Sequence, residues 1–373
     1  MAGIYIHVPF CRKACHYCNF HFSTSVKQTA AMTNAICKEA HLRKHYINES
    51  VATIYFGGGT PSLLRAEELA QLLQTFKAHF LIDDNAEITL ETNPDDITAV
   101  KLGAWKNLGI NRLSIGIQSF FEEDLQWMNR AHNAQQAMNC ILLAQQAGFY
   151  NITIDLIYGT PTLTDEKWKA NVDTAIGLNI PHLSCYALTV EPKTALEKLV
   201  ATHQLENVDP EKQSRHFELL MEWAGAAGYE HYEISNFAKP GFRSRHNSSY
   251  WSGSHYLGLG PSAHSFNGTS RQWNIANNAL YIKNIDASVL PFEIEHLTPV
   301  QQLNEYIMTA LRTSEGIDLA FIAGKWGDDK KEQLQKNIAA LVEPGFIKNG
   351  SATVKLTPQG KLFADGIAAA LFF

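Results

Sequence analysis

The sequence predicts an α/β protein in which six strand–helix repeats build a parallel sheet, followed by a small domain of helices and a hairpin. The first half of the chain alternates short β-rich runs with amphipathic segments, which is the pattern of parallel strands joined by crossover helices. The length of 373 residues suggests two domains, or one large domain with an appendage. Beyond residue 297 the pattern changes to helices followed by a hairpin.

The expected strands are rich in Ile, Val, Tyr and Thr, and several of them end in Gly, Pro or Asn. They cover residues 4–8, 53–56, 87–92, 112–118, 151–158 and 182–188. The segments between them place apolar residues at helical spacing. These helices cover residues 29–46, 67–80, 97–108, 135–147 and 166–178, with one more at 210–228. We therefore expect residues 1–228 to form one α/β domain.

Residues 229 to about 268 show little regular period and are rich in Gly, Ser, His and aromatic residues. Four histidines lie here (His231, His246, His255 and His264), although an even spread of the 15 histidines would place fewer than two. A long irregular segment inside a compact protein is usually functional or disordered, and the aromatic residues argue against disorder. We expect residues 229–296 to be a connecting segment rich in His and aromatic residues.

Residues 297–373 are expected to form a small α+β domain that resembles a winged helix. Helices are predicted at 304–312 and 332–341, a hairpin within 345–357 that turns at Asn349–Gly350, and a closing helix at 357–371. Winged-helix domains often bind DNA. The chain has 31 Lys and Arg against 37 Asp and Glu, a net charge of −6, so the composition argues against a nucleic-acid partner.

The chain shows neither a membrane span nor a signal peptide. No run approaches the ~18 apolar residues that a membrane helix needs. Near the start, the basic residues follow the apolar stretch, whereas in a signal peptide they precede it. We therefore expect a cytoplasmic protein with reduced thiols, and six cysteines are too few for a disulfide scaffold.

Three cysteines fall within eight residues, directly after the first expected strand: Cys11, Cys15 and Cys18. Three thiolates on one loop can hold three irons of a [4Fe–4S] cluster and leave the fourth iron free to bind a small molecule. The alternative is a zinc site completed by His16 or His21. Zinc sites usually combine two Cys-x-x-Cys pairs, and the sequence has no second pair, so the cluster is favoured.

Glycines and polar residues follow the expected strands at their carboxyl ends, where α/β barrels build their sites. Bare glycines such as those in Gly57-Gly58-Gly59-Thr60-Pro61 let backbone groups approach a ligand, although a glycine run is often only a turn. Each of the other residues alone would be a capping or surface group. Together they predict a site at this edge of the sheet, with Asp155 inside its strand and the others at or just past a strand end: Glu91, Gln118, Arg130 and Ala187.

The cysteine spacing, with Tyr17 between the last two cysteines, resembles the radical S-adenosylmethionine (SAM) superfamily. In that superfamily SAM chelates the open iron, and an electron from the reduced cluster releases a 5′-deoxyadenosyl radical. The resemblance implies a partial (β/α)6 barrel, and a cluster with three cysteine ligands and an exchangeable SAM. It implies that the cofactor is bound by Tyr5, Tyr17, Phe20, Gly58, Gly59, Thr60, Glu91, Gln118, Arg130, Asp155, Ala187 and His264.

The opening stretch Tyr5-Ile-His7-Val-Pro9-Phe-Cys11 resembles oxygen-independent coproporphyrinogen III dehydrogenase and its relatives, and the resemblance covers nearly the whole chain. Two departures separate this chain from the dehydrogenase. Phe20 stands where the dehydrogenase has a fourth cysteine, and Cys11 lies too close to the start for the extension that helps to cover the substrate. Instead, the segment from His246 to Trp251 matches the His-Asn-x-x-Tyr-Trp motif of the HemW-type haem chaperones.

This second resemblance implies a protein that binds haem and hands it to an acceptor, such as a respiratory protein at the inner membrane face. The chemistry of a cluster that must be reduced implies a flavodoxin-like reductant, and the resemblance is compatible with a homodimer. The candidate haem-binding residues are His246, Asn247, Tyr250 and Trp251. From the residues alone, a structural loop histidine is favoured over a haem ligand at His246, and rival ligands are His264, His255 and His7.

Two other functions remain open at this level: coproporphyrinogen decarboxylation, and an unrelated radical SAM reaction. No catalytic residue is assigned.

Overall fold

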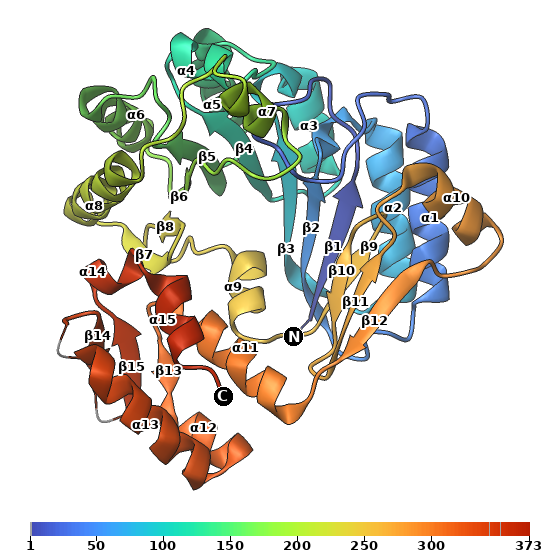
Figure 1. The fold of residues 1–373 in the computed structure, drawn as a ribbon. Coiled ribbons are helices and arrows are strands. Elements are labelled where there is room, and N and C mark those ends of the chain that lie inside the picture. Colours follow the sequence, from blue (N-terminus) through green and yellow to red (C-terminus); the bar gives the residue numbers. More distant parts are fainter. Residues whose placement is uncertain (1, 343, 351) are drawn as a thin grey trace.

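The computed structural model describes residues 2–342, 344–350 and 352–373. Six strands pair in parallel in chain order (Figure 1). They are β1 (Ala2–Val8), β2 (Val51–Gly58), β3 (Ile82–Thr92), β4 (Arg112–Gln118), β5 (Ile152–Tyr158) and β6 (His182–Ala187). In the described part of the chain β1 and β6 do not pair with each other, so the barrel is open. The predicted α/β class and partial barrel are confirmed.

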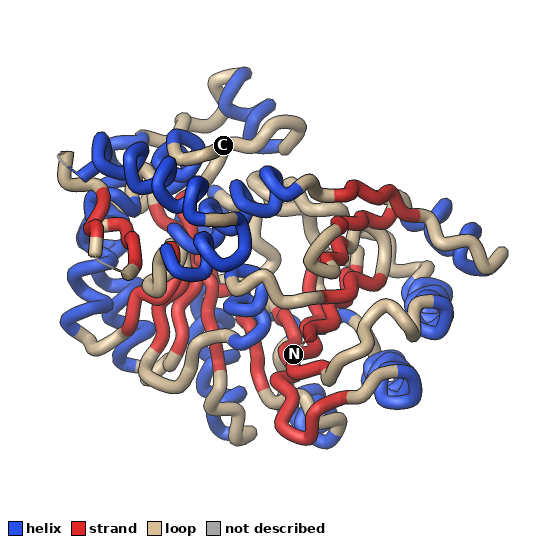
Figure 2. The backbone as a smooth tube through the Cα atoms, turned by 90° about the horizontal axis from the view of Figure 1, so that it is seen from below, coloured by secondary structure: helices blue, strands red, loops and turns tan. Residues whose placement is uncertain are grey.

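Helices cover the outer side of these strands, as Figure 2 shows for the blue helices around the red arc of strands. The crossover helices are α1 (Thr29–Leu42), α2 (Ala66–His79), α3 (Ala99–Asn107), α5 (Ala134–Gln146) and α6 (Asp165–Gly177), followed by α8 (Pro210–Ala226). All six were predicted, with ends that differ by up to four residues. Four short elements were not: α4 (Glu122–Trp127), α7 (Ala195–Ala201), and the 3-10 turns η1 (Pro61–Leu63) and η2 (Pro94–Asp96).

The segment 229–268 is regular, so the prediction of an irregular stretch is wrong. It contains β7 (Glu230–Glu233), β8 (Asn236–Ala238), α9 (Arg245–Trp251), β9 (Tyr256–Leu259) and β10 (His264–Phe266), and it is followed by β11 (Ser270–Asn274), α10 (Asn278–Asp286) and β12 (Phe292–His296). Within the described residues the sheet runs in the order β12-β11-β10-β9-β1-β2-β3-β4-β5-β6-β8-β7. These strands extend both edges of the parallel sheet. Each has three to five residues, too few to show a period.

Alternation along the parallel strands separates an apolar layer from a polar one. On β1, Ile4 and Ile6 are fully buried in the core beneath the helices. Their neighbour Tyr5 points to the inner face, where its ring stacks on that of Tyr55 from β2 at 6.1 Å between centroids. Since strand side chains alternate between faces, the inside of the open barrel is lined with polar and aromatic groups.

Residues 299–371 form a smaller unit with its own apolar core, which includes Leu303, Ile322 and Val354. Its elements are α11 (Pro299–Leu311), β13 (Ile317–Asp318), α12 (Leu319–Trp326), α13 (Asp328–Val342), β14 (Ile347–Asn349), β15 (Thr353–Leu356), α14 (Pro358–Lys361) and α15 (Ala364–Ala370). This confirms a small C-terminal α+β unit. No helix among the residues that the structure describes is long and apolar enough to cross a membrane.

Three details of the C-terminal prediction are wrong. Helix α12 was missed, and the closing helix is two helices separated at residues 362–363. The hairpin exists, but Asn349 pairs with Val354, so the connection lies between these two residues and not at Asn349–Gly350. Part of that connection, residue 351, lies outside the described residues.

Candidate functional site

The cysteine loop follows β1 and is closed at its base by two backbone hydrogen bonds. Cys11 N donates to Ser23 O at 3.0 Å, and Ser23 N donates to Pro9 O at 2.9 Å. Farther along, His16 N donates to Met128 O at 3.1 Å, which ties the loop to the end of α4. The loop is therefore held from its base and from its middle.

A cavity of about 430 Å³ lies between this loop and the carboxyl ends of the strands. Most of the predicted site residues line it, although they come from positions spread over the first half of the chain: Cys11, Cys15, Tyr17, Cys18, Phe20, Gly58, Gly59, Thr60, Glu91, Gln118, Arg130, Asp155 and Ala187. Tyr5 is not among the lining residues; it lies deeper, against Tyr55. His264 is also outside the lining and is exposed on β10.

Arg130 joins the cysteine loop to the strands. Its Nη1 lies 3.2 Å from Cys15 Sγ and 3.3 Å from the Tyr17 hydroxyl. Its Nη2 donates to Asn93 Oδ1 at 2.8 Å and to Gly116 O at 3.0 Å. The guanidinium thus places a fixed positive charge beside a cysteine sulfur, where a thiolate would be stabilised.

Cys11 and Cys18 are partly buried, which disfavours the charged forms of their thiols. Burial raises the pKa of Cys11 to about 11, although the hydroxyl of Thr60, 3.5 Å from the sulfur, opposes the shift. Burial also raises the pKa of Cys18. Because metal ligation requires thiolates, these residues need the positive charge of bound metal to deprotonate near neutral pH.

Two carboxyl groups face the same cavity. Burial, with repulsion from Asp155, raises the pKa of Glu91 to about 8. Burial raises the pKa of Asp155 to about 6, against the opposing charge of Arg112. Glu91 accepts hydrogen bonds from the Tyr55 hydroxyl at 2.8 Å and from Gly58 N at 3.2 Å. A cation bound in the cavity would lower both pKa values, so the pair fits a positively charged ligand.

The glycine motif lies directly behind the cysteine loop. A Cβ on Gly59 would come within 2.6 Å of the Phe10 carbonyl oxygen. A Cβ on Gly58, whose φ is +105°, would come within 2.6 Å of the His7 ring. Both positions therefore require glycine, because the end of β2 lies close to β1 and to the start of the cysteine loop. Nearby, Gln118 has a φ of 60°, and its Oε1 is buried without a hydrogen-bond partner in the structure. A strained residue with an unsatisfied polar atom is typical of a binding site.

The two histidines considered for a zinc site lie outside the lining of this cavity. His16 Nδ1 is 3.0 Å from Trp127 O, and His21 Nε2 is 2.7 Å from Asn278 Oδ1. Each ring therefore serves a loop contact. Among the described residues, no three His, Cys, Asp or Glu side chains are already grouped to hold one metal ion.

His246, the first residue of the His-Asn-x-x-Tyr-Trp motif, lies at the opposite end of the barrel interior. Its side chain is buried, with Nδ1 2.8 Å from Thr53 Oγ1 and Nε2 2.9 Å from the Tyr250 hydroxyl. Burial, followed by the charge of Arg112, lowers its pKa to about 3. The ring is therefore neutral, and both of its nitrogens are already engaged.

The rest of the motif is placed differently. The backbone N–H of Asn247 donates to Oγ of Ser244, the residue that caps the N-terminus of α9, at 3.2 Å. Tyr250 and Trp251 line a second cavity, which lies between the barrel and the C-terminal unit. Of the rival histidines, His7 is buried, and its Nε2 lies 2.8 Å from His21 O.

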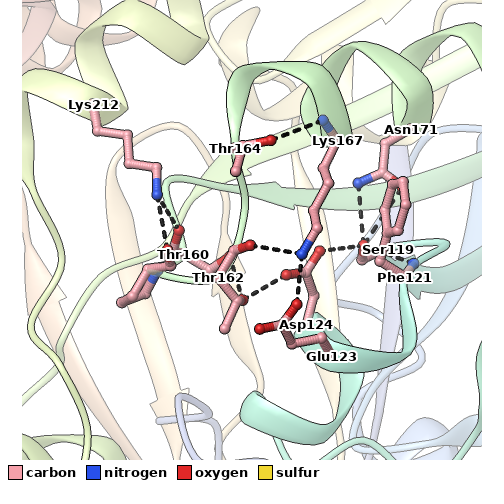
Figure 3. Close-up of polar contacts among 11 residues, drawn as sticks. Ser119, Phe121, Glu123, Asp124, Thr160, Thr162, Thr164, Lys167, Asn171 and Lys212 are labelled. Carbon is pink, nitrogen blue, oxygen red and sulfur yellow. Dashed lines mark hydrogen bonds and ion pairs between the residues drawn. The ribbon is translucent and has the colours of Figure 1, made fainter.

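A polar network joins α4 and the loops after β4 and β5 to α6 and α8 (Figure 3). Asp124 is buried and accepts hydrogen bonds from Ser119 Oγ at 2.7 Å and Thr162 Oγ1 at 2.5 Å. Lys167 Nζ donates to Glu123 at 2.5 Å and to Thr162 O at 3.1 Å. The loops that follow β4 and β5 are thereby fixed to each other.

The network lies next to the cysteine loop through the end of α4. There, Trp127 O and Met128 O contact the side chain and the backbone N–H of His16. Lys212 from α8 extends it by donating to Thr160 O at 3.0 Å. The sequence analysis missed the network and also Tyr55 and Arg112 in the barrel interior. The alternation of Thr53, Tyr55 and Gly57 on one face of β2 is the signal that would have found Tyr55.

Comparison with known proteins covers both parts of the chain. The model of the radical SAM superfamily matches residues 5–175, and that of the HemN C-terminal domain matches residues 297–363. A heme chaperone HemW of Bacillus subtilis is 34% identical over 99% of both chains. One from Mycobacterium tuberculosis is 32% identical over 99% of this chain and 94% of its own.

Two proteins of Escherichia coli are also similar to this chain, one in sequence and one in fold. Its heme chaperone HemW is 37% identical over 70% of this chain and 69% of its own. The solved structure of its coproporphyrinogen III oxidase, HemN, described as a radical SAM enzyme, superposes with a TM-score of 0.86. That match covers all of this chain and 90% of the other at 23% identity, so it shows the shared fold.

Proposed function

The chain belongs to the HemW family of haem chaperones, within the radical SAM superfamily, and from this premise we propose that it binds haem and transfers it to an acceptor protein. The observation that carries the proposal is that the cysteines and the motif residues line different cavities. One contains the three cysteines, and the other is lined by Tyr250 and Trp251 of the motif. A carrier that holds a cluster and a cargo at once needs two such places.

We propose that Cys11, Cys15 and Cys18 hold a [4Fe–4S] cluster and leave one iron open to an exchangeable SAM. The chemistry of the cavity supports this assignment. SAM carries a sulfonium and an ammonium group, which fit the two half-buried carboxyl groups that line the cavity, Glu91 and Asp155. When bound, a reduced cluster supplies one electron to SAM.

The residues of the chain have distinct roles in this proposal. Arg130 fixes Cys15 and Tyr17, and Gly58 and Gly59 let the strand end approach the cysteine loop. Gln118 offers an unpartnered amide oxygen to the cavity. Phe20 and Ala187 line the cavity. Tyr5 and His264 lie outside its lining, and their proposed role in cofactor binding stays a prediction.

The acceptor that we propose is a membrane-associated respiratory protein approached from the cytoplasmic face, with a flavodoxin-like protein as reductant and a homodimer as a compatible assembly. The competing activity is coproporphyrinogen decarboxylation. The cavity of the cysteines has Phe20 where the dehydrogenase carries a further cysteine, and 66% of this residue is exposed.

The test is anaerobic reconstitution of the cluster, followed by two assays on one preparation. We expect uptake of about one haem per chain with a shifted Soret band, and no conversion of coproporphyrinogen III. Transfer is then measured by loss of that band as an apo-haem acceptor in vesicles gains haem. Turnover of coproporphyrinogen without stable haem uptake would reverse the choice between the two functions.

A further inference from the structure

The barrel interior holds a buried arginine whose charge has no direct partner. Arg112, the first residue of β4, is 1% exposed. Its Nε, Nη1 and Nη2 all lack a hydrogen-bond partner among the residues that the structure describes. Buried water would satisfy these N–H groups, but it would not neutralise the charge. Because an unpaired buried charge is costly, its presence indicates that the charge itself has a role.

Arg112 lies directly below the cavity that contains the cysteines. Alternate residues of a strand share one face, and on the inner face of β4 these are Arg112, Ser114, Gly116 and Gln118. The last three line the cavity, whereas Arg112 is not among the lining residues. The arginine is therefore one step deeper in the barrel than the lining. An effect of its charge on a ligand in the cavity must pass through a neighbouring side chain.

The neighbour on the adjacent strand is Asp155, which lines the cavity. Strands β4 and β5 pair with Ser114 opposite Thr153. On the inner face, Arg112 comes one step before this pair and Asp155 one step after it. The charge of Arg112 acts on this carboxyl group: burial raises the pKa of Asp155 to about 6, and Arg112, followed by Arg130, opposes the rise. Arg112 is thus the leading influence that favours the carboxylate form.

The other charged and titratable groups around this pair are neutral or have partners of their own. Glu87 accepts hydrogen bonds from two backbone N–H groups at the start of α9, at 3.2 and 3.1 Å. Burial, followed by the charge of Arg112, lowers the pKa of His182 and of His246, so both rings are neutral at pH 7. Arg130 is already bound to the cysteine loop. The remaining groups within electrostatic reach, in the described part of the chain, are Tyr55, Glu91, Cys185, Tyr186 and Tyr232.

We propose that Arg112 is a positioning residue for the cofactor, because its buried charge keeps Asp155 in the carboxylate form that a positively charged ligand needs. The inference rests on the proposed function, which takes SAM as that ligand. The sulfonium of SAM is positive at every pH, so it gains more from a carboxylate than from a neutral carboxyl group. Arg112 is among the groups that shift the pKa of Asp155 and not among those that shift the pKa of Glu91. Asp155 ionises first, with a pKa of about 6 against about 8 for Glu91.

The first measurement is the pH dependence of SAM binding to the reconstituted holoprotein, followed through the paramagnetic resonance spectrum of the reduced cluster. In the wild type, SAM affinity should fall as the pH drops through about 6, where Asp155 takes up its proton. Arg112→Gln should move this midpoint upward by about one pH unit and weaken SAM binding about five- to tenfold at and below that pH. Arg112→Lys, which keeps a cation, should stay near the wild-type midpoint. Any titration of SAM itself is common to all variants and cancels in this comparison.

A second measurement needs no cofactor. The carbon-13 signal of the Asp155 carboxyl group, identified by its loss in Asp155→Asn, reports the pKa in the cofactor-free protein. Its midpoint should rise in Arg112→Gln and equally in Arg112→Met, which replaces the cation by an apolar chain, so either variant serves if the other does not fold. Arg243→Gln is the matched control, because this half-buried arginine stacks over Tyr232 and pairs with exposed carboxylates outside the barrel interior. It should leave the midpoint unchanged.

A double variant distinguishes a role through Asp155 from general support of the fold. In the Asp155→Asn protein no carboxyl group remains at this position for Arg112 to act on. Adding Arg112→Gln should therefore leave the SAM affinity of Asp155→Asn unchanged. A residue that only supports the fold would weaken SAM binding by the same factor in both backgrounds.

The outcomes separate this inference from the proposed function. If SAM leaves the wild-type cluster spectrum unchanged at every pH, the proposed SAM site fails and this inference fails with it. If the wild type responds to SAM while Arg112→Gln and Arg112→Met keep its midpoint in both measurements, the SAM site stands and Arg112 has no such role. If Arg112→Lys raises the midpoint as much as Arg112→Gln does, the shape of the side chain matters and not its charge, which also overturns the inference.

Discussion

Replacing Glu91 by Gln should stabilise the cofactor-free protein at high pH, because the native fold disfavours the charged form of this carboxyl group. Its pKa is raised from 4.5 to about 8, first by burial and then by Asp155. Glutamine has nearly the same shape and can still meet the Tyr55 hydroxyl and Gly58 N, which now contact the carboxylate at 2.8 and 3.2 Å. The main change is therefore the loss of a titrating charge.

The size of the effect follows from the two pKa values. The native pKa lies above the unfolded one, so protonation favours the native state. The resulting stability is fully present below pH 4.5 and is lost as the pH rises through about 8. Each pH unit in that window corresponds to about 1.4 kcal/mol. Between pH 5.5 and pH 9 the wild type should lose about 3 kcal/mol that Glu91→Gln does not lose. The side chain keeps some exposure to the cavity, so this is an upper bound.

Urea unfolding of cluster-free protein at pH 5.5 and pH 9 measures this difference, provided that the denaturant slopes of the two proteins agree. Thr89→Val is the control: it lies on the same strand, is fully buried and has no titrating group, so it should shift stability equally at both pH values. A Glu91→Gln effect that is equal at the two pH values would show that the carboxylate is not destabilising. The reasoning about a cationic ligand would then lose its basis.

Three further predictions concern the cysteine cavity. Cys15→Ala should abolish the iron and acid-labile sulfide of the reconstituted protein, whereas Cys37→Ala, on α1, should leave both near four per chain; stoichiometric zinc without sulfide would contradict the cluster. SAM should perturb the paramagnetic resonance spectrum of the reduced cluster, and Asp155→Ala should weaken this effect at unchanged iron content. Asp124→Ala leaves the hydroxyls of buried Ser119 and half-buried Thr162 without their acceptor and should cost about 2–3 kcal/mol of unfolding free energy, measured by urea titration. An unaltered urea midpoint would mean that the network in Figure 3 does not brace the fold.

The parallel strands and crossover helices were predictable because their patterns are long and strong. Helix α2, for example, buries Leu69, Leu72, Leu73 and Phe76 at helical spacing. The edge strands were not predictable for two reasons. They are short, and their pairing depends on contacts far along the chain, such as β9 beside β1, where Gly3 pairs with Tyr256. The histidine-rich composition of the same segment favoured a loop, although it forms strands.

For the cysteine cavity, the position of residues at strand ends was sufficient to gather most of the lining. Parallel strands bring their carboxyl ends together whatever lies between them, so Glu91, Gln118 and Arg130 share one cavity. The histidines could not be ranked in this way. The partner of His246 is Thr53, 193 positions away, and the partner of His255 is Glu49. Only the folded arrangement shows that the His246 ring is buried with both nitrogens engaged, whereas the His255 ring is exposed beside a carboxylate.

The polar interior of the barrel connects the two cavities through one set of contacts. The His246 ring stacks on Tyr55 at 4.9 Å, the Tyr55 hydroxyl donates to Glu91, and Glu91 accepts from Gly58 behind the cysteine loop. At the other end of this series, His246 Nε2 lies 2.9 Å from the hydroxyl of Tyr250, which lines the second cavity. The contacts of the barrel interior therefore run from Gly58, behind the cysteine loop, to helix α9.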